Sequence, residues 1–426
     1  MSGTKSTRVL LFLLAFLTSC GNPSSNSNNL NFPFGISVCS YTCNIAPSVS
    51  SPTPISKAFA AVTSYGTHQI LIFYSPSNST NPYGFNINNT SLAPSTSLYN
   101  WLQGPDGVLI SSQGFTTSNG YSCQAPVLYG ADGIGNKISI WCGYDPSNTN
   151  NPGPTITINS TSFLSPEGMA LDWVDTSGTV LSAPILFVAN PGSSNILAFD
   201  LRQITGGGDV TLGPSGGILP GTNGGLPFGQ PANGTSLNGP AFVAFSSSKN
   251  TLFVSNTGNS QVNIYGNGYC LGVNLESGTG CASTSQNVTP TVWFSGTNTY
   301  LSTPTGLVYY QGSLYVADYS ANAVLIWDNV LNTIAPGGNV APTRRINGSN
   351  TILNAVYAIS IDDNPTAPPG NIFFLSQINS GNLLGYNNAT TTSGNIAPTF
   401  NINVINPTLS TGNGSGGGTT GYPGFF

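Results

Sequence analysis

A pattern of fourteen residues recurs six times along this chain and constrains the fold more than any other feature. Most copies begin with large apolar residues. All carry Ser, Asp, Asn or Gln at the fifth position, pass through a polar turn and end in an aromatic residue. The copies span 60–73, 128–141, 186–199, 252–265, 314–327 and 373–386. Consecutive copies start 58 to 68 residues apart, which indicates a repeat architecture.

Each copy has the character of a β-hairpin. In "LYVADYSANAVLIW" (314–327) a short apolar strand, a polar turn and a second strand with alternating apolar residues follow one another. Weaker motifs flank the hairpins on both sides. Apolar runs that suit a buried inner strand precede them at 165–173, 238–245, 303–310 and 354–362. Proline-containing runs that suit an edge strand follow them at 151–158, 287–294, 339–346 and 395–402.

One repeat therefore supplies four antiparallel strands, and six repeats predict an all-β, six-bladed β-propeller. A single four-stranded sheet cannot bury both of its faces, whereas a closed ring packs every sheet between two neighbours. The composition agrees, because 52 glycines and 31 prolines provide many turns and no long helical pattern is present.

The succession "TPTGLVYY…LYVADYSANAVLIW" resembles NHL-type repeats, whose pattern is P-x-G-hydrophobic, then LYVAD, then N-x-I-x-aromatic. The resemblance extends from Ala60 to Ile402, is good in the last four units, and implies an NHL-like propeller. The first two units depart from it. Residues 102–126 form a long extra segment, and the first hairpin lacks an evident inner strand. We expect that strand in 403–426 or, alternatively, in 50–58.

The first nineteen residues have the features of a secretory signal, with a basic start and the apolar run Val9–Leu17. The ending Leu17-Thr18-Ser19-Cys20 resembles the lipobox of bacterial lipoproteins, in which the cysteine is diacylated and becomes the new N-terminus. An ordinary signal peptide that contains a cysteine is the alternative. Gly21 stands where an aspartate favours inner-membrane retention, so the resemblance implies the outer membrane of the cell envelope. A lipid anchor is then the expected membrane contact, because no other stretch approaches 18 apolar residues.

This reading predicts three parts: a signal peptide at 1–19, a flexible Ser/Asn-rich tether at 20–36 and a single propeller domain at 37–426. With Cys20 lipidated, the other six cysteines fall into sequence-local couples that suit disulfides in an exported protein. The couples are Cys39–Cys43, Cys123–Cys142 and Cys270–Cys281. A zinc site is not expected, since His68 is the single histidine.

Charge is scarce, and this limits the classes of partner. Only 5% of residues are charged, and the formal net charge is −5. No basic patch is present to neutralise phosphates, which argues against a nucleic-acid partner. A surface of Asn, Ser, Thr and Gly suits a protein or carbohydrate ligand instead.

Catalytic signals are weak. His68 lies in the polar turn of the first copy, where the other copies carry Asn, Ser or Gly, so we interpret it as a turn residue. A serine triad would need this histidine, and no G-x-S-x-G motif is present. Tyr65 and Tyr319, in hairpin turns, are candidates for stacking on a sugar ring. The six terminal aromatics are expected to pack between blades.

Carboxylates and amides remain as candidate site residues. The fifth positions carry Asp132, Asn190, Asn256 and Asp318, with Ser64 and Gln377 in the two other copies. They either rim a binding surface at the channel mouth or cap their own turns. Glu167 begins an inner strand and is expected at the same mouth. Resemblance to NHL-like and gluconolactonase-like enzymes implies a Ca²⁺ site there as the alternative to a protein without cofactor.

The sequence thus predicts a non-catalytic binding, adhesion or scaffold module, with a Ca²⁺-dependent lactonase or lyase as the alternative. A site usually breaks the symmetry of its repeat. Function is therefore expected where the copies differ, namely at Glu167, Asp172, Arg344-Arg345 and the inserts 102–126 and 202–237.

Overall fold

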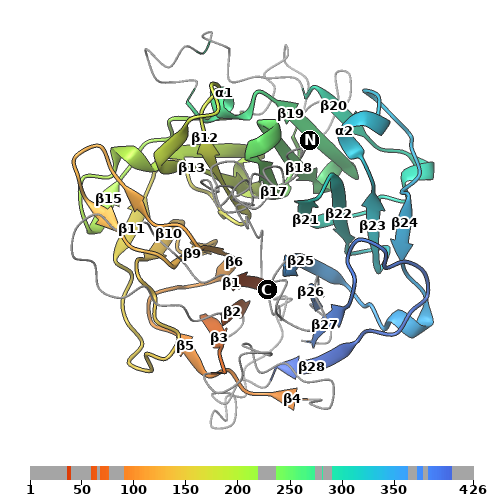
Figure 1. The fold of residues 1–426 in the computed structure, drawn as a ribbon, viewed down its shortest axis with the longest axis horizontal. Coiled ribbons are helices and arrows are strands. Elements are labelled where there is room, and N and C mark those ends of the chain that lie inside the picture. Colours follow the sequence, from red (N-terminus) through yellow and green to blue (C-terminus); the bar gives the residue numbers. More distant parts are fainter. Residues whose placement is uncertain are drawn as a thin grey trace, which may run out of the picture.

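The structure, a computed structural model, describes residues 36–39, 59–64, 68–75, 91–218, 237–273, 281, 290–362, 372–377 and 382–404. Within these residues the chain forms an all-β propeller, in which six sheets of four or five strands surround a central axis (Figure 1). Strands within a sheet are antiparallel, apart from short parallel additions at two outer edges.

The first three sheets follow the chain in order, and their strands run from the axis to the rim. The first contains β1 (Ile36–Cys39), β2 (Phe59–Ser64), β3 (Gln69–Phe73) and β5 (Thr96–Leu98). The second contains β6 (Pro105–Ser111), β9 (Val127–Asp132), β10 (Lys137–Trp141), β11 (Ile156–Asn159) and β15 (Gly208–Thr211). The third contains β12 (Met169–Val174), β13 (Val180–Asn190), β14 (Asn195–Asp200) and β16 (Gly216–Ile218).

The last three sheets continue around the ring. The fourth contains β17 (Pro240–Ser246), β18 (Thr251–Asn256), β19 (Gln261–Gly266) and β20 (Val292–Phe294). The fifth contains β21 (Pro304–Tyr310), β22 (Ser313–Asp318), β23 (Ala323–Trp327) and β24 (Arg344–Ile346). The sixth contains β25 (Val356–Asp362), β26 (Ile372–Gln377), β27 (Asn382–Tyr386), β28 (Phe400–Val404) and β4 (Ser91–Leu92).

Helical segments are short and lie in the connections. The α-helices are α1 (Gly268–Gly272) and α2 (Val330–Thr333). The 3₁₀ turns are η2 (Pro191–Ser193), η3 (Leu201–Gln203), η4 (Ser247–Lys249), η5 (Thr257–Asn259), η6 (Thr297–Thr299) and η7 (Ser349–Thr351). None of the helices in the described part of the chain combines the length and the apolar character needed to cross a membrane.

The six predicted hairpins are confirmed as the two middle strands of the six sheets. In every copy the first residue pairs with the terminal aromatic residue. The pairs are Ala60–Phe73, Leu128–Trp141, Leu186–Phe199, Leu252–Tyr265, Leu314–Trp327 and Phe373–Tyr386. Each fourteen-residue copy therefore consists of two strands and the turn between them.

The turn is built the same way in five copies. Its last residue adopts the left-handed conformation, with φ between 47° and 57°. These residues are His68, Asn136, Ser194, Ser260 and Asn322. Asn tolerates this conformation better than most residues, and the structure supports the interpretation of His68 as a turn residue.

The order of strands differs between the first sheet and the other five. In the other five, the innermost strand precedes the hairpin, as predicted for the last four; in the second sheet β6 lies in a segment that was expected to be an insertion. In the first sheet the innermost strand is β1. Its first residue, Ile36, is the last residue of the segment predicted to be a tether. The two segments predicted for this strand, 50–58 and 403–426, lie outside the described residues except for the end of β28. The structure thus shows five blades with the predicted order of strands rather than six.

The second sheet resolves the apparent insertion at 102–126. This segment holds the innermost strand β6 and a small hairpin of β7 (Phe115–Thr116) and β8 (Ser122–Cys123). The hairpin carries Cys123, which is bonded to Cys142 with the Cα atoms 5.0 Å apart. Cys270 is bonded to Cys281 at 5.4 Å. Two predicted disulfides are confirmed, and the Cys39–Cys43 pair lies outside the described side chains.

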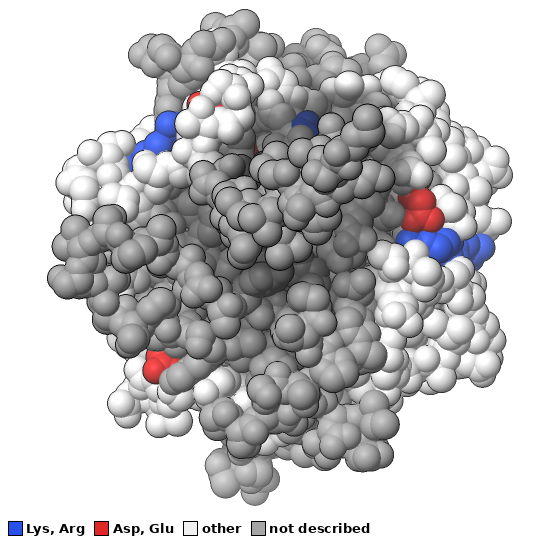
Figure 2. All heavy atoms as spheres, in the orientation of Figure 1, with Lys and Arg blue, Asp and Glu red and all other residues white. Residues whose placement is uncertain are grey.

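Side chains on the two faces of each sheet fill the spaces toward its two neighbours. Along β22, Leu314 and Val316 belong to one apolar cluster, and Tyr315 and Ala317 belong to another. The terminal aromatics of all six hairpins are buried, as predicted. Among the described residues on the face drawn in Figure 2, charged side chains are few and scattered. Apolar packing between the sheets therefore provides most of the stability.

Neighbouring sheets are also joined at the rim. The outer strand of a sheet is bonded to the segment that connects the third and fourth strands of the next sheet. β15 lies in such a connection and pairs in parallel with β11. Gly338 and Gly394, in the corresponding connections of the fifth and sixth sheets, form parallel bridges with Phe294 and Ile346.

The same arrangement recurs at the three remaining boundaries. α1 lies against β16, where Ser215 Oγ donates to the carbonyl of Gly272 at 2.7 Å. The Asn151 side chain exchanges two hydrogen bonds of 2.9 Å with the main chain of Tyr99. β4, from the first sheet's connection, pairs with β28 of the last sheet. At the axis, each innermost strand contacts the next one, and β25 contacts β1.

Candidate functional site: an acid cluster at the axis

The innermost strands begin with a break in the pairing register. Pro105 pairs with Asp132 and Gly107 with Ala131, which leaves Asp106 unpaired as a bulge. The same shift occurs at the start of β17, β21 and β25. A bulge redirects the side chain of the extra residue, and such bulges are common beside functional sites.

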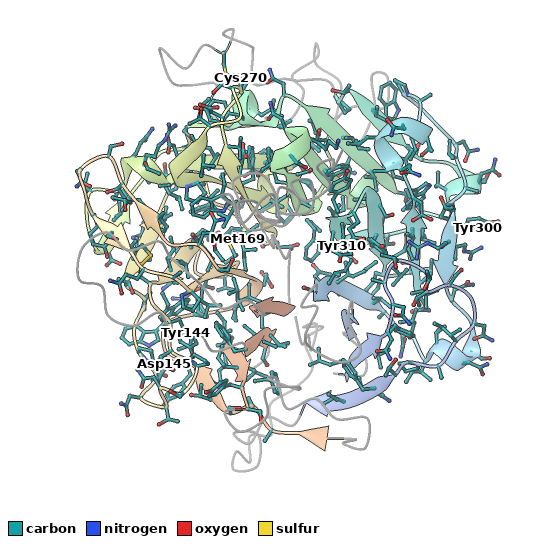
Figure 3. All side chains as sticks on the ribbon, in the orientation of Figure 1. Tyr144, Asp145, Met169, Cys270, Tyr300 and Tyr310 are labelled. Carbon is teal, nitrogen blue, oxygen red and sulfur yellow. A yellow bond between two sulfur atoms is a disulfide. The ribbon has the colours of Figure 1, made fainter. Side chains whose placement is uncertain are left out.

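The register places five residues at corresponding positions around the axis. They are Asp106, Glu167, Ala241, Thr305 and Tyr357, from the second to the sixth sheet. Glu167 stands two residues before Met169, the first residue of β12, which lies toward the axis in Figure 3. Because the sheets are arranged around the axis, these five positions point to a common region.

Three of these side chains interact. The Tyr357 hydroxyl donates to Glu167 Oε2 at 3.2 Å. Tyr357 comes from the sixth sheet and Glu167 from the third, which lie on opposite sides of the ring, so this bond crosses the axis (Figure 1). Asp106, from the second sheet, holds the neighbouring bulge position, and its pKa is raised by burial and by the Glu167 carboxylate. We call Asp106, Glu167 and Tyr357 the axial acid cluster.

Burial and mutual repulsion shift the acids toward their neutral forms. Burial raises the pKa of Glu167 to about 8, although the hydrogen bond from Tyr357 acts in the opposite direction. Burial, Glu167 and Asp132 together raise the pKa of Asp106 well above its usual value. Asp106 is 9% exposed, and within the described residues no donor is bonded to its carboxyl oxygens. The two acids therefore hold protons at pH values where free carboxyls are ionised.

Aromatic rings stand beside the acids. The Phe242 ring meets the Tyr357 ring edge-on, with centroids 5.1 Å apart. Tyr319, from the hairpin turn of the fifth sheet, and Tyr357 both pack on Ala355. The predicted stacking candidate Tyr319 thus lies next to the axial acid cluster, whereas Tyr65 lies outside the described residues. The site combines carboxyl groups with partly exposed phenol rings.

The predicted fifth-position residues take a different role. Asp132, Asn190, Asn256 and Asp318 are fully buried, each at 0% exposure. Their side chains accept hydrogen bonds from the loop that leads into the innermost strand of the same sheet. Within the predicted channel-mouth set, only Glu167 joins the cluster.

Asp132 and Asp318 show this bracing most fully. Asp318 accepts from the backbone N–H of Ser302 at 2.7 Å and of Ala321 at 2.9 Å. Asp132 accepts from Gln103, Gly104 and Gly135 at 2.8 to 2.9 Å.

The two amides act in the same way. Asn190 and Asn256 accept from the N–H of Leu164 at 2.6 Å and of Asn238 at 2.7 Å. Asp132 and Asp318 therefore cap their own turns as well as bonding to the adjacent loop, whereas Asn190 and Asn256 accept from the adjacent loop and do not cap the turns that follow them.

Asp106 and Tyr357 were missed from the sequence. A signal for Asp106 exists, because "PDG" at 105–107 repeats the "PEG" at 166–168 that brought Glu167 to notice. It was hidden in a segment interpreted as an insertion. Tyr357 lacks a flanking Pro or Gly, and only the register of β25 against β26 reveals its position.

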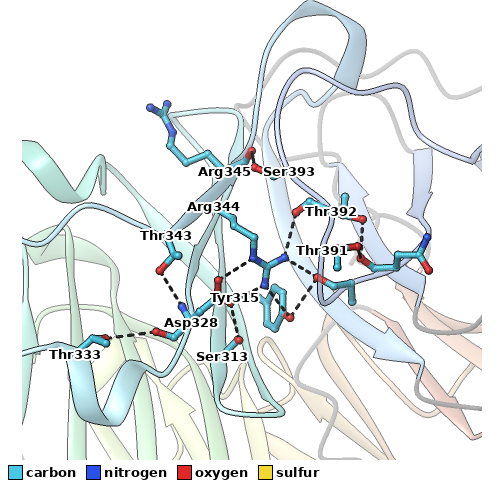
Figure 4. A network of polar contacts seen from close by, with 12 residues as sticks. Ser313, Tyr315, Asp328, Thr333, Thr343, Arg344, Arg345, Thr391, Thr392 and Ser393 are labelled. Carbon is cyan, nitrogen blue, oxygen red and sulfur yellow. Dashed lines mark hydrogen bonds and ion pairs between the residues drawn. The ribbon is translucent and has the colours of Figure 1, made fainter.

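The other asymmetric residues lie away from the cluster. Arg344 bridges the fifth and sixth sheets at the rim (Figure 4). It binds Asp328 with Nε at 3.0 Å and Nη2 at 2.7 Å, and it donates to the carbonyls of Ala389 and Thr392. Arg345 lies over the Tyr300 ring, 3.8 Å from its centroid. These contacts are structural.

Asp172 lies toward the opposite end of β12 from Glu167. Its Oδ1 accepts from Val174 N–H and Ser247 Oγ, both at 3.1 Å, whereas its buried Oδ2 has no hydrogen-bond partner among the described residues. Burial raises its pKa to about 7.

A Ca²⁺ cage does not fit the described residues. Within them no group of three or more His, Cys, Asp or Glu side chains could hold a metal ion. Ca²⁺ takes six to eight oxygen ligands, and the cluster offers two carboxyls. The next carboxylate, Asp132, is already bonded to three backbone N–H groups.

Comparisons with known proteins add little. No family model matches the chain, and no curated protein does. A solved chain of a nidogen/laminin complex is similar at a TM-score of 0.39 and 10% identity, over 77% of this chain and 84% of that one. Virginiamycin B lyase from Staphylococcus aureus is similar at 0.37 and 10%, over 85% and 83%. Similarity this weak carries no argument about function.

Proposed function

We propose that this chain is a non-catalytic binding module whose ligand binds at the axial acid cluster. The observation that carries the proposal is the hydrogen bond of 3.2 Å from Tyr357 to Glu167 across the axis, next to the bulge position that holds the largely buried Asp106. Carboxyl groups in a largely buried place gain from a ligand that supplies hydrogen-bond donors.

The rest of the ring suits a rigid support. Polar residues at the hairpin ends are bonded to adjacent loops, and the rim connections join one sheet to the next. A site held in this way needs little reordering on binding, which favours affinity. Tyr319 and Tyr357 add apolar surface for a protein or carbohydrate ligand.

We further infer that the first sheet, with β1, acts as the sixth blade of an NHL-like ring, because it occupies the place between β6 and β25. We propose that Cys20 carries the lipid, that residues 20–36 tether the domain, and that the protein faces outward from the outer membrane. No nucleic-acid partner is proposed.

The test is binding of the labelled protein to arrays of glycans and peptides. Glu167→Gln and Asp106→Asn should each lose the signal, and Asp209→Asn should retain it, because Asp209 is an exposed acid on β15 at the rim. Thermal unfolding checks that the variants are folded. If both cluster variants bind as well as the parent protein, the proposal is wrong.

A second candidate is an enzyme of the lactonase or lyase type. The observation in its favour is Glu167, whose pKa of about 8 suits a general acid or base near neutral pH. The Ca²⁺-dependent form of this hypothesis predicts that Ca²⁺ raises the melting temperature. We expect no such shift, because the described carboxyls do not form a cage.

A further inference from the structure

When its two acids are ionised, the axial acid cluster has more hydrogen-bond acceptors than donors. Tyr357 offers one hydroxyl proton, and that proton is directed to Glu167. Among the described residues, no Lys or Arg lies within ion-pair distance of Asp106 or Glu167. The cations that form ion pairs there bind other acids: Lys137 is 4.0 Å from Asp132, Arg202 is bonded to Asp200, and Arg344 is bonded to Asp328.

The shortage of donors and of positive charge in the cluster indicates which chemical class of ligand it would bind. Two neighbouring carboxyls repel each other when both are ionised. In the free protein the two acids avoid this repulsion by holding protons, and a neutral sugar would leave them in that form. A cation supplies donors and cancels the charge at once, which is the condition for stable burial of an ionised carboxylate.

The surroundings favour an organic cation over a metal ion. The described acids are too few for a metal cage. Phenol and phenyl rings, by contrast, attract ammonium groups through their faces, and Tyr357 stands against the ring of Phe242. On the path from Glu167 to Tyr357 that passes through the fourth and fifth sheets, the bulge positions carry the small residues Ala241 and Thr305.

We propose that the ligand group held at the axial acid cluster is an alkylammonium, bound by the carboxylates of Asp106 and Glu167 against the ring of Tyr357. This inference rests on the proposed binding function and names its chemical class. A lysine side chain and an amino sugar both carry such a group.

Binding of this kind is coupled to proton release. In the free protein the raised pKa values keep the acids protonated. The ammonium stabilises the ionised carboxylates, so a proton leaves for solvent as the ligand binds. The lysine amine stays protonated up to about pH 10, whereas the amine of an amino sugar loses its proton nearer neutral pH, so the lysine probe is the one that tests the pH dependence. Affinity should therefore rise between about pH 5 and pH 8.

The experiment is calorimetric titration of the full chain with matched probes. Nα-acetyl-lysine amide and glucosamine carry the ammonium, and Nα-acetyl-norleucine amide and N-acetylglucosamine are their uncharged counterparts. We expect one charged probe, and neither uncharged probe, to bind. Its affinity should fall at least tenfold in Glu167→Gln and Asp106→Asn and stay unchanged in Asp209→Asn. Titrations in buffers of different ionisation enthalpy should show proton release near pH 6.

The outcomes separate the two proposals. If an uncharged probe binds as tightly as its charged counterpart and needs Glu167, the binding function stands and the ammonium inference is wrong. If the charged probes bind without needing Glu167 or Asp106, or if none of the four probes binds, the ammonium inference is wrong. The binding function then depends on the array experiment. If Asp106→Asn does not fold, Glu167→Gln alone tests whether binding needs the cluster.

Discussion

The rim and the axis of this ring treat charge in opposite ways. At the rim, Arg344 donates to Asp328 and to two carbonyls of the next sheet, and its bonds to Asp328 hold the pKa of that carboxyl below its usual value. At the axis, Glu167 has a tyrosine hydroxyl as its partner, and burial raises its pKa to about 8. Paired charges join sheets at the rim, whereas at the axis burial holds the acid in its neutral form.

The contrast between rim and axis suggests which substitutions affect stability and which affect binding. Positions repeated in every sheet, together with their rim contacts, should dominate the free energy of unfolding. The bulge positions differ between sheets and should affect it little, or in a pH-dependent way. Substitutions at both places can break this division, and their expected effects range from several kcal/mol to a fraction of one.

Trp327→Ala should produce the largest loss. The side chain is 1% exposed, and its ring centroid lies 4.7 Å from that of Phe294 in the preceding sheet. Its Nε1–H donates to the Val340 carbonyl at 3.1 Å. Removing it leaves a cavity between two sheets, at a cost of about 3–5 kcal/mol. Urea unfolding measures the change. Trp101→Ala, which removes a ring that is 41% exposed, is the control and should cost about 1 kcal/mol or less.

Arg344→Ala should cost about 2–3 kcal/mol, because it leaves Asp328 and the carbonyls of Ala389 and Thr392 without their donor. Arg345→Ala is a matched control on the same strand. It removes a cation stacked on the exposed Tyr300 ring and should cost below about 1 kcal/mol. Equal losses in the two variants would show that the rim contacts of Arg344 have no special role.

The division between rim and axis also explains what the sequence could predict. The strands were predictable because one repeated period sets them, and Leu314 and Trp327 mark the two ends of a paired hairpin. Strand β1 could not be predicted, because its four residues, "ISVC", do not match any part of the repeated pattern. The cluster was half predictable. Glu167 stood out at the start of a predicted inner strand, but the bulge that brings Tyr357 across the axis depends on strand register.

The free energy of unfolding should fall as pH rises, because two acids of the third sheet's innermost segment have raised pKa values in the folded protein. The folded-state pKa values of Glu167 and Asp172 are raised, to about 8 and about 7. The folded protein thus binds more protons than the unfolded chain between about pH 4 and pH 8. Their contribution is complete below about pH 4 and is lost as pH rises through the folded-state values.

Glu167→Gln isolates this effect. At pH 8.5 it should raise the free energy of unfolding by about 1–2 kcal/mol, because the partly exposed carboxyl no longer has to ionise. At pH 4 it should change little. Asp209→Asn, at the rim, should leave the pH profile of the parent protein intact. An unchanged profile in Glu167→Gln would mean that this acid is not held in its neutral form.

Asn322→Gly should give the smallest effect and tests how the axis is supported. Asn322 Oδ1 accepts from the N–H of Ala355, in the loop that leads to Tyr357, and the residue has a φ of 47°. Glycine tolerates this φ, so the substitution removes the hydrogen bond without adding strain. The expected cost is about 0.5–1.5 kcal/mol.

Gln311→Gly is the control for Asn322→Gly, because Gln311 has a φ of 48°, is exposed and bonds only its neighbour Tyr310 among the contacts described. It should be neutral or slightly stabilising. Ligand affinity gives a second measure. If the Asn322 bond positions Ala355, and through it Tyr357, then Asn322→Gly weakens binding of the charged probe while Gln311→Gly does not. Equal affinity in both variants would show that the cluster is positioned by β25 alone.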